Sequence, residues 1–141
     1  MREEYERLER CEVNHAPLTP LSLFTRTAEV YPHATAIIYG ERQVSWAQMH
    51  LRCRRLASAL ARAGVGQGDT VAIMASNTPE MLEAHFGVPM CGGVLNALNV
   101  RLDPRSIAFM LQHAEAKVLL ADIEYSATVN TALAEMAAPP L

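Results

Sequence analysis

The stretch Thr70–Asn99, TVAIMASNTPEMLEAHFGVPMCGGVLNALN, decides the fold. It opens with the apolar run 71–75, closes with the apolar run 93–98, and places Asn-Thr-Pro-Glu between them. Proline is favoured at the first position of a helix, where Asn77 or Thr78 can cap the free amides. Both runs are apolar at consecutive positions, so each is predicted to lie in a sheet that is covered on both faces. The stretch therefore predicts a right-handed strand–helix–strand unit.

Pro89 falls inside the helix of this unit. Because proline has no N–H to donate to the carbonyl of His85, it predicts a kink or an end of the helix at this point. Gly92 and Gly93 follow directly and predict a tight turn into the second strand.

Similar signals mark the elements on either side of this unit. In most of the helices a capping residue, often with a proline, precedes an apolar stripe, and the two hairpin runs flank a glycine turn. The predicted elements are a helix over 20–31, strands over 36–39 and 43–45, a helix over 46–63, a helix over 104–113, a strand over 117–121 and a helix over 126–136. The alternation is typical of an α/β fold with a doubly wound, mostly parallel sheet, here with an N-terminal β-hairpin. Residues 1–16 are strongly charged and are predicted to be a mobile arm, with the folded domain over 17–141.

The composition limits the function classes. The chain has 141 residues, half of them hydrophobic, which suffices for one domain with a core. Its formal net charge of -3 leaves no basic surplus, so nucleic acid is not an expected partner. Three separated cysteines without a CxxC motif argue against a disulfide framework or a structural zinc and indicate a reducing, cytoplasmic location. No run is apolar and long enough for a signal peptide or a membrane span.

The glycines of the segment GVGQGD, residues 64–69, suggest a nucleotide loop at first sight. A phosphate-binding loop follows a strand and opens a helix, so that the amides of the helix N-terminus face the phosphate. These glycines instead follow a helix and lead into a strand, which favours a turn that ends the helix.

The histidines and cysteines offer few ligand sets. His50 and Cys53 are three residues apart on one helix and could hold a metal ion, but no second pair completes a tetrahedral site. Cys53 is therefore predicted to pack in the core, with His50 beside it. His85, near Glu83 on the central helix, is predicted to be a buried or partly exposed structural histidine. The remaining histidines fall near element ends and are predicted to be solvated: His15, His33 and His113.

Polar residues also follow the predicted strands at the edge where α/β sheets bind ligands. Arg101 could contact an anion there, although a surface ion pair with Asp103 is the simpler interpretation. Helix capping accounts for Ser76 and Asn77. No catalytic triad, carboxylate pair or Walker loop can be assembled, so no catalytic, cofactor-binding or metal-binding residue is assigned.

Several motifs in order resemble the beginning of an AMP-forming acyl-CoA synthetase. They are Pro17-Leu18-Thr19-Pro20-Leu21, Trp46 with Arg52-Cys53-Arg54-Arg55-Leu56-Ala57, Gly66-Gln67-Gly68-Asp69-Thr70-Val71-Ala72, Asn77-Thr78-Pro79-Glu80, Ala84-His85-Phe86-Gly87-Val88-Pro89-Met90, Leu95-Asn96-Ala97-Leu98-Asn99-Val100-Arg101-Leu102-Asp103 and Glu115-Ala116-Lys117-Val118-Leu119. The resemblance is to the AMP-dependent synthetase and ligase family, over about residues 14–130. Its details are similar to the medium-chain or methylthiopropionate-type acyl-CoA ligases.

The resemblance implies a two-step reaction. A carboxylate attacks the α-phosphate of Mg-ATP to give an acyl-adenylate, and the CoA thiol then displaces AMP to give a thioester. ATP, Mg and CoA are thus implied for the full-length family. The family's phosphate loop with its lysine, its aromatic-Thr-Glu motif, its ribose-binding aspartate and its C-terminal lysine have no counterpart in these residues. The chain is accordingly predicted to be an incomplete AMP-binding domain, a partial N-terminal subdomain that binds no cofactor and is inactive alone.

Two other functions stay open. The chain could be an interaction or regulatory module that pairs through an exposed sheet edge with the rest of a synthetase or with another copy, because an open strand edge and exposed apolar faces favour association. An independent small hydrolase or nucleotide binder is the third alternative, although no site for one can be assembled.

Overall fold

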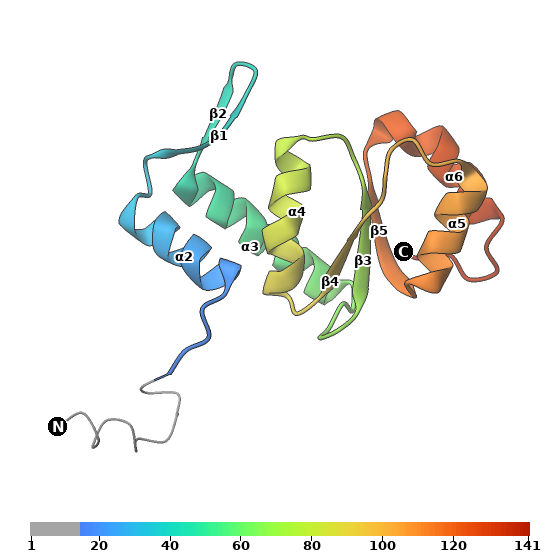
Figure 1. The fold of residues 1–141 in the computed structure, drawn as a ribbon, viewed down its shortest axis with the longest axis horizontal. Coiled ribbons are helices and arrows are strands. Elements are labelled where there is room, and N and C mark those ends of the chain that lie inside the picture. The colour runs from blue at the N-terminus through green and yellow to red at the C-terminus, as the bar shows by residue number, and fades with distance from the viewer. Residues whose placement is uncertain (1–14) are drawn as a thin grey trace.

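A parallel sheet of three strands forms the centre of the computed structural model, which describes residues 15–141 (Figure 1). β3 (Thr70–Met74) is the middle strand, with β4 (Val94–Ala97) on one side and β5 (Ala116–Ala121) on the other. Val71 of β3 is aligned with Val118 of β5. The arm predicted over 1–16 lies almost wholly outside the described residues.

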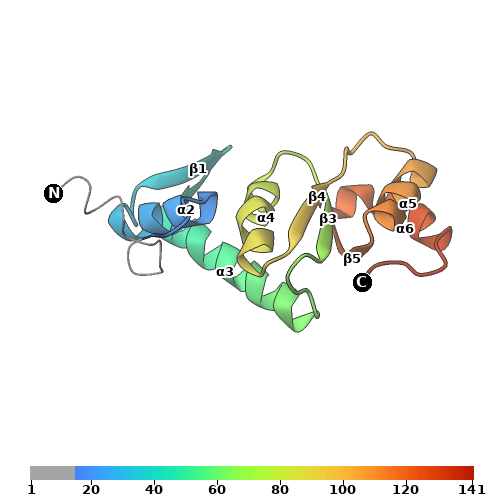
Figure 2. The ribbon, with the colours of Figure 1, turned by 60° about the horizontal axis from the view of Figure 1, so that its bottom comes forward.

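Helices cover both faces of this sheet (Figures 1 and 2). α3 (Trp46–Arg62) and α4 (Pro79–Met90) lie on one face, and α5 (Pro104–His113) and α6 (Ser126–Ala134) lie on the other. The side chains of β3 alternate between two hydrophobic cores, because successive residues of a strand point to opposite faces. One core contains Leu60, Val71, Ile73, Ala84 and Val88, and the other contains Ala72, Met74, Ile107, Leu111 and Val129. This arrangement confirms the predicted doubly wound α/β fold.

The N-terminal part of the described chain adds a helix and a hairpin beside α3. α2 (Pro20–Val30) precedes the antiparallel pair β1 (Thr35–Tyr39) and β2 (Arg42–Ser45). A third core joins them to α3 through Phe24, Val44, Met49 and Cys53. The ring centroids of Phe24 and Phe86 are 4.4 Å apart, so this core also reaches α4. The predicted hairpin is confirmed.

The predicted caps explain where the helices begin. In each case a side-chain oxygen accepts a hydrogen bond from the amide three residues later, which satisfies one of the free donors of the first turn. The caps are Thr19 of α2, Ser45 of α3, Thr78 of α4 and Asp103 of α5.

Two local predictions need correction. α4 continues through Pro89 and ends at Met90, so an end of the helix at Pro89 itself is wrong by one residue, while the bend near Pro89 stays a prediction. Because Pro89 lies in the last turn, the helix loses only one amide donor there. The turn that follows is confirmed, since Gly92 has a φ of 85° and Gly93 donates its N–H to the Val88 carbonyl at 3.1 Å.

The second correction concerns β4. Its apolar sequence predicted a strand covered on both faces, as β3 is, but Val94 is 53% exposed. β4 lies at the edge of the sheet and has only β3 as a neighbour in the described part of the chain. The helices cover the middle strand fully and this edge strand only in part.

α3 and α4 approach each other closely at Gly87. A Cβ atom at Gly87 would lie 2.7 Å from Cδ2 of Leu56 and 3.1 Å from the carbonyl oxygen of Cys53. The second contact is with backbone, which cannot turn aside as a flexible side chain can. The missing side chain of Gly87 therefore sets the distance between the two helices.

We expect Gly87→Ala to lower the free energy of unfolding by up to about 2 kcal/mol in urea titrations of the isolated chain. Overpacking costs about 1–3 kcal/mol, of which the replacement of glycine in a helix offsets about 1 kcal/mol. Gly66→Ala is the matched control, because a Cβ there meets only Oδ2 of Asp69 at 3.7 Å. A Gly87→Ala chain as stable as the original would contradict this account of the helix contact.

Candidate functional site

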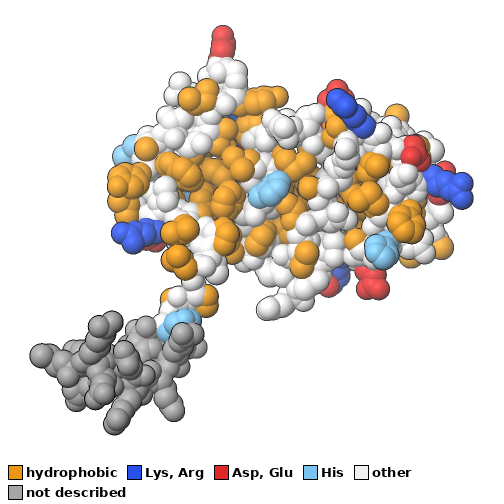
Figure 3. All heavy atoms as spheres, in the orientation of Figure 1, with side chains coloured by type: hydrophobic (Ala, Val, Ile, Leu, Met, Phe, Trp, Pro, Cys, Tyr) orange, Lys and Arg blue, Asp and Glu red, His pale blue; other side chains and the backbone are white. Residues whose placement is uncertain are grey.

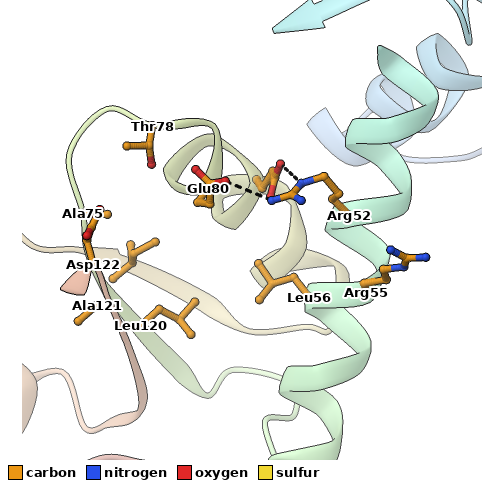
Figure 4. A pocket seen from close by; sticks show the side chains of 11 residues that line it. Arg52, Arg55, Leu56, Ala75, Thr78, Glu80, Leu120, Ala121 and Asp122 are labelled. Atoms are coloured by element: carbon orange, nitrogen blue, oxygen red, sulfur yellow. Dashed lines mark hydrogen bonds and ion pairs between the residues drawn. The ribbon is translucent and has the colours of Figure 1, made fainter. Parts of the chain in front are cut away.

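A cleft of about 540 Å³ opens at the carboxyl ends of β3 and β5, beside α3 and α4 (Figure 4). Ligands of open α/β sheets bind at this edge, so the cleft is the candidate site. Leu56, Ile73 and Leu120 make part of its wall apolar. The residues that line it are Arg52, Arg55, Leu56, Ile73, Ala75, Thr78, Glu80, Glu83, Leu120, Ala121 and Asp122.

Two arginines and two glutamates form a connected ion-pair network at one end of the cleft. Arg52 donates from Nε to Glu83 and from Nη2 to Glu80, the second at 3.3 Å. Arg42 of the hairpin donates to the same Glu80 oxygen at 2.9 Å. The Glu83 side chain is only 8% exposed, whereas that of Glu80 is 52% exposed. The network thus ties the hairpin, α3 and α4 together around one buried carboxylate.

The charges of this network satisfy one another. The hydrogen bond to Glu83 raises the pKa of Arg52 above its ordinary value, and the hydrogen bond from Arg42 lowers the pKa of Glu80. Glu80 is therefore ionised at neutral pH and serves as an acceptor rather than as a general acid. Figure 4 shows Arg52 turned toward Glu80, while Arg55 points away from it.

Cys53 lies next to the network and is confirmed as a core residue. It is fully buried, and its Sγ donates to the Glu83 carbonyl at 3.6 Å. Burial raises the pKa of the Cys53 thiol to about 12. Since the thiolate is the form that attacks electrophiles and binds metals, Cys53 is suited to neither task at neutral pH. The ring of His50 meets Phe24 edge-on at 5.4 Å, beside the same core.

The other histidines lie on the surface. His85 was predicted to be buried or partly exposed, and this is wrong: it is exposed, with Nδ1 2.8 Å from the Met81 carbonyl oxygen. Its position on α4 turns it away from the core that Ala84 and Val88 face. Within residues 15–141, no three side chains of His, Cys, Asp or Glu are grouped closely enough to hold a metal ion. The remaining histidines are exposed as predicted: His15, His33 and His113.

Capping was the explanation given for Ser76 and Asn77, with Asn77 or Thr78 as the candidate cap of α4, and in the structure the cap is Thr78. Pro79 occupies the first helical position, which places residue 78 at the cap. Ser76 instead lies 2.6 Å from the Tyr125 hydroxyl and joins the end of β3 to the short 3-10 helix η1 (Ile123–Tyr125). Ser76 therefore has a structural role at this edge of the sheet, whereas Asn77 is exposed.

The side chain of Arg101 takes part in none of the ion pairs of residues 15–141. The ion pair with Asp103 is wrong, because the Asp103 carboxylate accepts hydrogen bonds from the amide and the hydroxyl of Ser106, at 3.0 and 2.6 Å. These bonds lower the pKa of Asp103. The Arg101 amide donates to Oδ1 of Asn99 at 2.9 Å, and its side chain is exposed. Helix capping thus takes up the carboxylate that was expected to pair with the arginine.

The glycine segment forms a turn, as predicted. Gly64 and Gly68 have φ values of 86° and 83°, which favour glycine. Asp69 accepts from the Gly66 amide at 2.7 Å and from Nζ of Lys117 at 2.8 Å, and Lys117 also donates to the Gly64 carbonyl at 2.6 Å. The hydrogen bond from Lys117 lowers the pKa of Asp69. The turn lies at the amino end of β3, at the opposite end of the strand from the cleft.

Sequence patterns missed the network of Arg52 and Glu83. Arg52 stands in a run of arginines on α3, a pattern typical of the solvent-facing side of a helix. The available signal was on α4, where Glu83 stands between Leu82 and Ala84 and three residues after Glu80. A carboxylate at a position that faces the core needs a cationic partner.

A second groove, of about 310 Å³, lies between the hairpin and the beginning of α4. Ile38, Tyr39 and Leu82 contribute to it and are 71%, 51% and 40% exposed. Figure 3 shows hydrophobic side chains gathered over the hairpin, α2 and α4 on this face of the molecule. None of the helices in the described part of the chain has the length and apolar character that crossing a membrane requires.

Comparison with known proteins gives one consistent result. A family profile described as AMP-binding enzyme matches residues 24–140. A peroxisomal acetate/butyrate–CoA ligase from Arabidopsis thaliana is 49% identical over 118 residues, which are 84% of this chain and 21% of that protein. A peroxisomal benzoate–CoA ligase from the same plant is 46% identical over 123 residues, which are 87% of this chain and 21% of that protein.

Solved structures agree with the sequence comparisons. A benzoate CoA ligase from Burkholderia xenovorans LB400 has a TM-score of 0.79 and 26% identity, covering 85% of this chain and 24% of that chain. This chain spans about a fifth of the length of the curated relatives it matches. The fold of the described residues is therefore one part of a larger enzyme fold.

We expect Glu83→Ala to lower the free energy of unfolding by about 1.5–3 kcal/mol, the range for hydrogen bonds to charged groups. Glu80→Ala is the matched control and should cost less than about 1 kcal/mol, because its ion pairs are exposed. Urea unfolding of both variants measures the difference. Equal losses in the two variants would contradict the central place given to Glu83.

We also expect the chain to lose stability in acid. The pKa values of Asp69, Glu80 and Asp103 are lowered by folding, so their contribution is present above the pKa values of the unfolded chain and is lost as the pH falls through the lower folded values. Urea midpoints should fall between pH 6 and about pH 3. Glu80→Gln should make that dependence shallower. Urea midpoints that rise toward acid pH would contradict the claim that folding lowers the pKa values of these three carboxylates.

Proposed function

Since this chain belongs to the AMP-binding enzyme family, we propose that it is the N-terminal segment of an ATP-dependent, AMP-forming carboxylic acid–CoA ligase. The similarity to the acetate/butyrate–CoA ligase, 49% over 118 residues, is the observation that carries the proposal. The parent enzyme joins a carboxylate to AMP and then transfers the acyl group to CoA. Its substrate is a short-chain carboxylic acid or an aromatic acid, as the names of the relatives suggest.

The segment contributes scaffold rather than chemistry. In this chain the Gly66 amide already binds Asp69, so the glycine turn does not present that amide to a phosphate. The Arg52 guanidinium is engaged by two glutamates and is not free for an anion. The groups that bind ATP, Mg and CoA therefore belong to the parent sequence outside this segment. Residues 17–141 then form the incomplete first part of the AMP-binding domain.

The cellular compartment of this segment is that of the parent enzyme. The absence of a CxxC motif and the spacing of the cysteines favour a reducing compartment, and the cytoplasm stays the prediction. The Arabidopsis relatives are named as peroxisomal, which makes the peroxisome the alternative. A fluorescent fusion of the parent protein distinguishes the two.

A second candidate function is a module that pairs with a full-length synthetase or with another copy. The exposed apolar side chains of Ile38, Tyr39, Leu82 and Val94 favour this alternative, because such surface tends to be covered by a partner. Sedimentation of the purified chain alone and mixed with a family synthetase tests it. A folded monomer that binds no synthetase would remove this alternative.

We expect the isolated chain to show no carboxylate-dependent exchange of pyrophosphate into ATP, since the adenylation groups lie outside it. The protein encoded by the coding DNA read past Leu141 should show the exchange with short-chain or aromatic acids. Measurable exchange by the pure isolated chain would contradict the proposal that the adenylation groups lie outside this segment. An inactive longer protein would contradict the proposed parent activity.

A further inference from the structure

A second group of arginines lies on the exposed face of α3, apart from the ion-pair network of the cleft. Arg54, Ser58 and Arg62 follow one another at intervals of four residues, so they lie along one face of the helix. Arg55 stands beside them, and these side chains line a hollow of about 330 Å³ together with Leu51. All of them are exposed to solvent.

The positive charge of this face is not neutralised within residues 15–141. The ion pairs of this part of the chain join Arg42, Arg52 and Lys117 to carboxylates, and none of them includes an arginine of the hollow. No aspartate or glutamate of the described residues lines the hollow. The hydroxyl at its centre already attracts one of the cations, since Nη1 of Arg62 donates to Oγ of Ser58 at 2.7 Å. The face therefore favours an anion at position 58.

A phosphoryl group on Ser58 would supply this anion. It adds a charge of about −1.5 to −2 at neutral pH and three acceptor oxygens. It would lie one helical turn from Arg54 and one from Arg62, the spacing at which opposite charges stabilise a helix, and the pair with Arg62 has the favoured order of anion before cation. Ser58 precedes the last turn of α3, which limits repulsion by the negative end of the helix dipole.

The residues before Ser58 also suit the enzymes that transfer phosphoryl groups. Many serine kinases select a serine by an arginine three residues before it, because their peptide sites carry complementary charge. Arg55 stands at that position. The same spacing joins Arg42 to Ser45, but Arg42 pairs with Glu80 and the Ser45 side chain caps α3. Of these two serines, Ser58 has the exposed hydroxyl and the arginine that lies outside the ion pairs of residues 15–141.

We propose that Ser58 is a phosphorylation site, and that Arg54 and Arg62 hold the phosphoserine on α3. In the kinase, Oγ of Ser58 attacks the γ-phosphorus of ATP and forms the new O–P bond. The bond from the γ-phosphorus to the β–γ bridging oxygen breaks, ADP leaves, and the hydroxyl proton passes to a carboxylate of the kinase. The kinase reaches the serine when the C-terminal end of α3 opens locally. The site is separate from the ligase chemistry of the proposed function, so neither depends on the other.

Treatment of the 141-residue chain with ATP and a kinase that selects arginine three residues before serine tests the site. Peptide mass spectrometry should find phosphate on Ser58 and none on Ser45. Arg55→Gln should slow incorporation at least about 10-fold, the loss expected for one charged contact. Arg101→Gln is the matched control, because it removes an exposed arginine elsewhere, and should leave the rate unchanged. A chain without phosphate on Ser58, or equal rates in the two variants, would overturn the proposal.

The stability of a chain that carries phosphoserine at position 58 tests the role of the arginines. At low salt its ratio of folded to unfolded chain in urea titrations should rise about 2- to 5-fold, and Arg62→Gln should remove part of the rise. Phosphothreonine at position 131 of α6 is the matched control and should lower the ratio, since Glu135 lies four residues after it. A phosphoserine chain that is less stable than the unmodified chain would refute the role given to Arg54 and Arg62.

Inorganic phosphate distinguishes an attached phosphoryl group from a bound ion. Added to the unmodified chain at constant ionic strength, it should leave the urea midpoint unchanged, because a free ion is not held at position 58 by a covalent bond. A rise equal to that of the phosphoserine chain would show that the face binds a free phosphate ion, and would overturn the assignment of Ser58 as a modification site.

Discussion

β3 is hydrogen-bonded along both edges and buried on both faces, and every other element is placed by this constraint. A strand in that position cannot carry polar side chains, which accounts for the run Val71 to Met74. Its alternate side chains enter two separate cores, so α3 and α4 must lie on one face and α5 and α6 on the other. The polar residues are left to the strand ends, where Ser76 joins Tyr125 and Asp69 joins Lys117.

The N-terminal helix and hairpin depend on the sheet only indirectly. They reach it through α3 and α4, which approach closely at Gly87 and share the ion pair of Arg52 with Glu83. The buried carboxylate makes this contact specific, since Glu83 is satisfied only when Arg52 lies beside it. The same network occupies one end of the cleft, and its four charged side chains pair with one another. The result is a set of tightly packed, ion-paired helices at the edge of the sheet where α/β folds bind ligands.

Most of the fold was predictable, because caps and hydrophobic spacing are local signals. The errors share a physical origin in contacts between distant segments. The exposure of β4 depends on whether another strand lies beside it. The apolar run 93–98 does not distinguish an edge strand from a central strand. From the sequence, the Asp103 carboxylate could either cap a helix or pair with Arg101. The structure shows that it caps α5 by accepting a hydrogen bond from the Ser106 amide. The cleft itself combines α3, α4 and β5, so no single motif could have indicated it.

The central claim is that β3 organises the whole chain. Native-state hydrogen exchange of the isolated chain in increasing urea tests it directly, because amides in the most stable element exchange only through global unfolding. The amides of β3 that bond to β4 and β5 should open with the same free energy as global unfolding, while those of the β1–β2 hairpin should open with a lower one. Hairpin amides that outlast those of β3 would contradict the account.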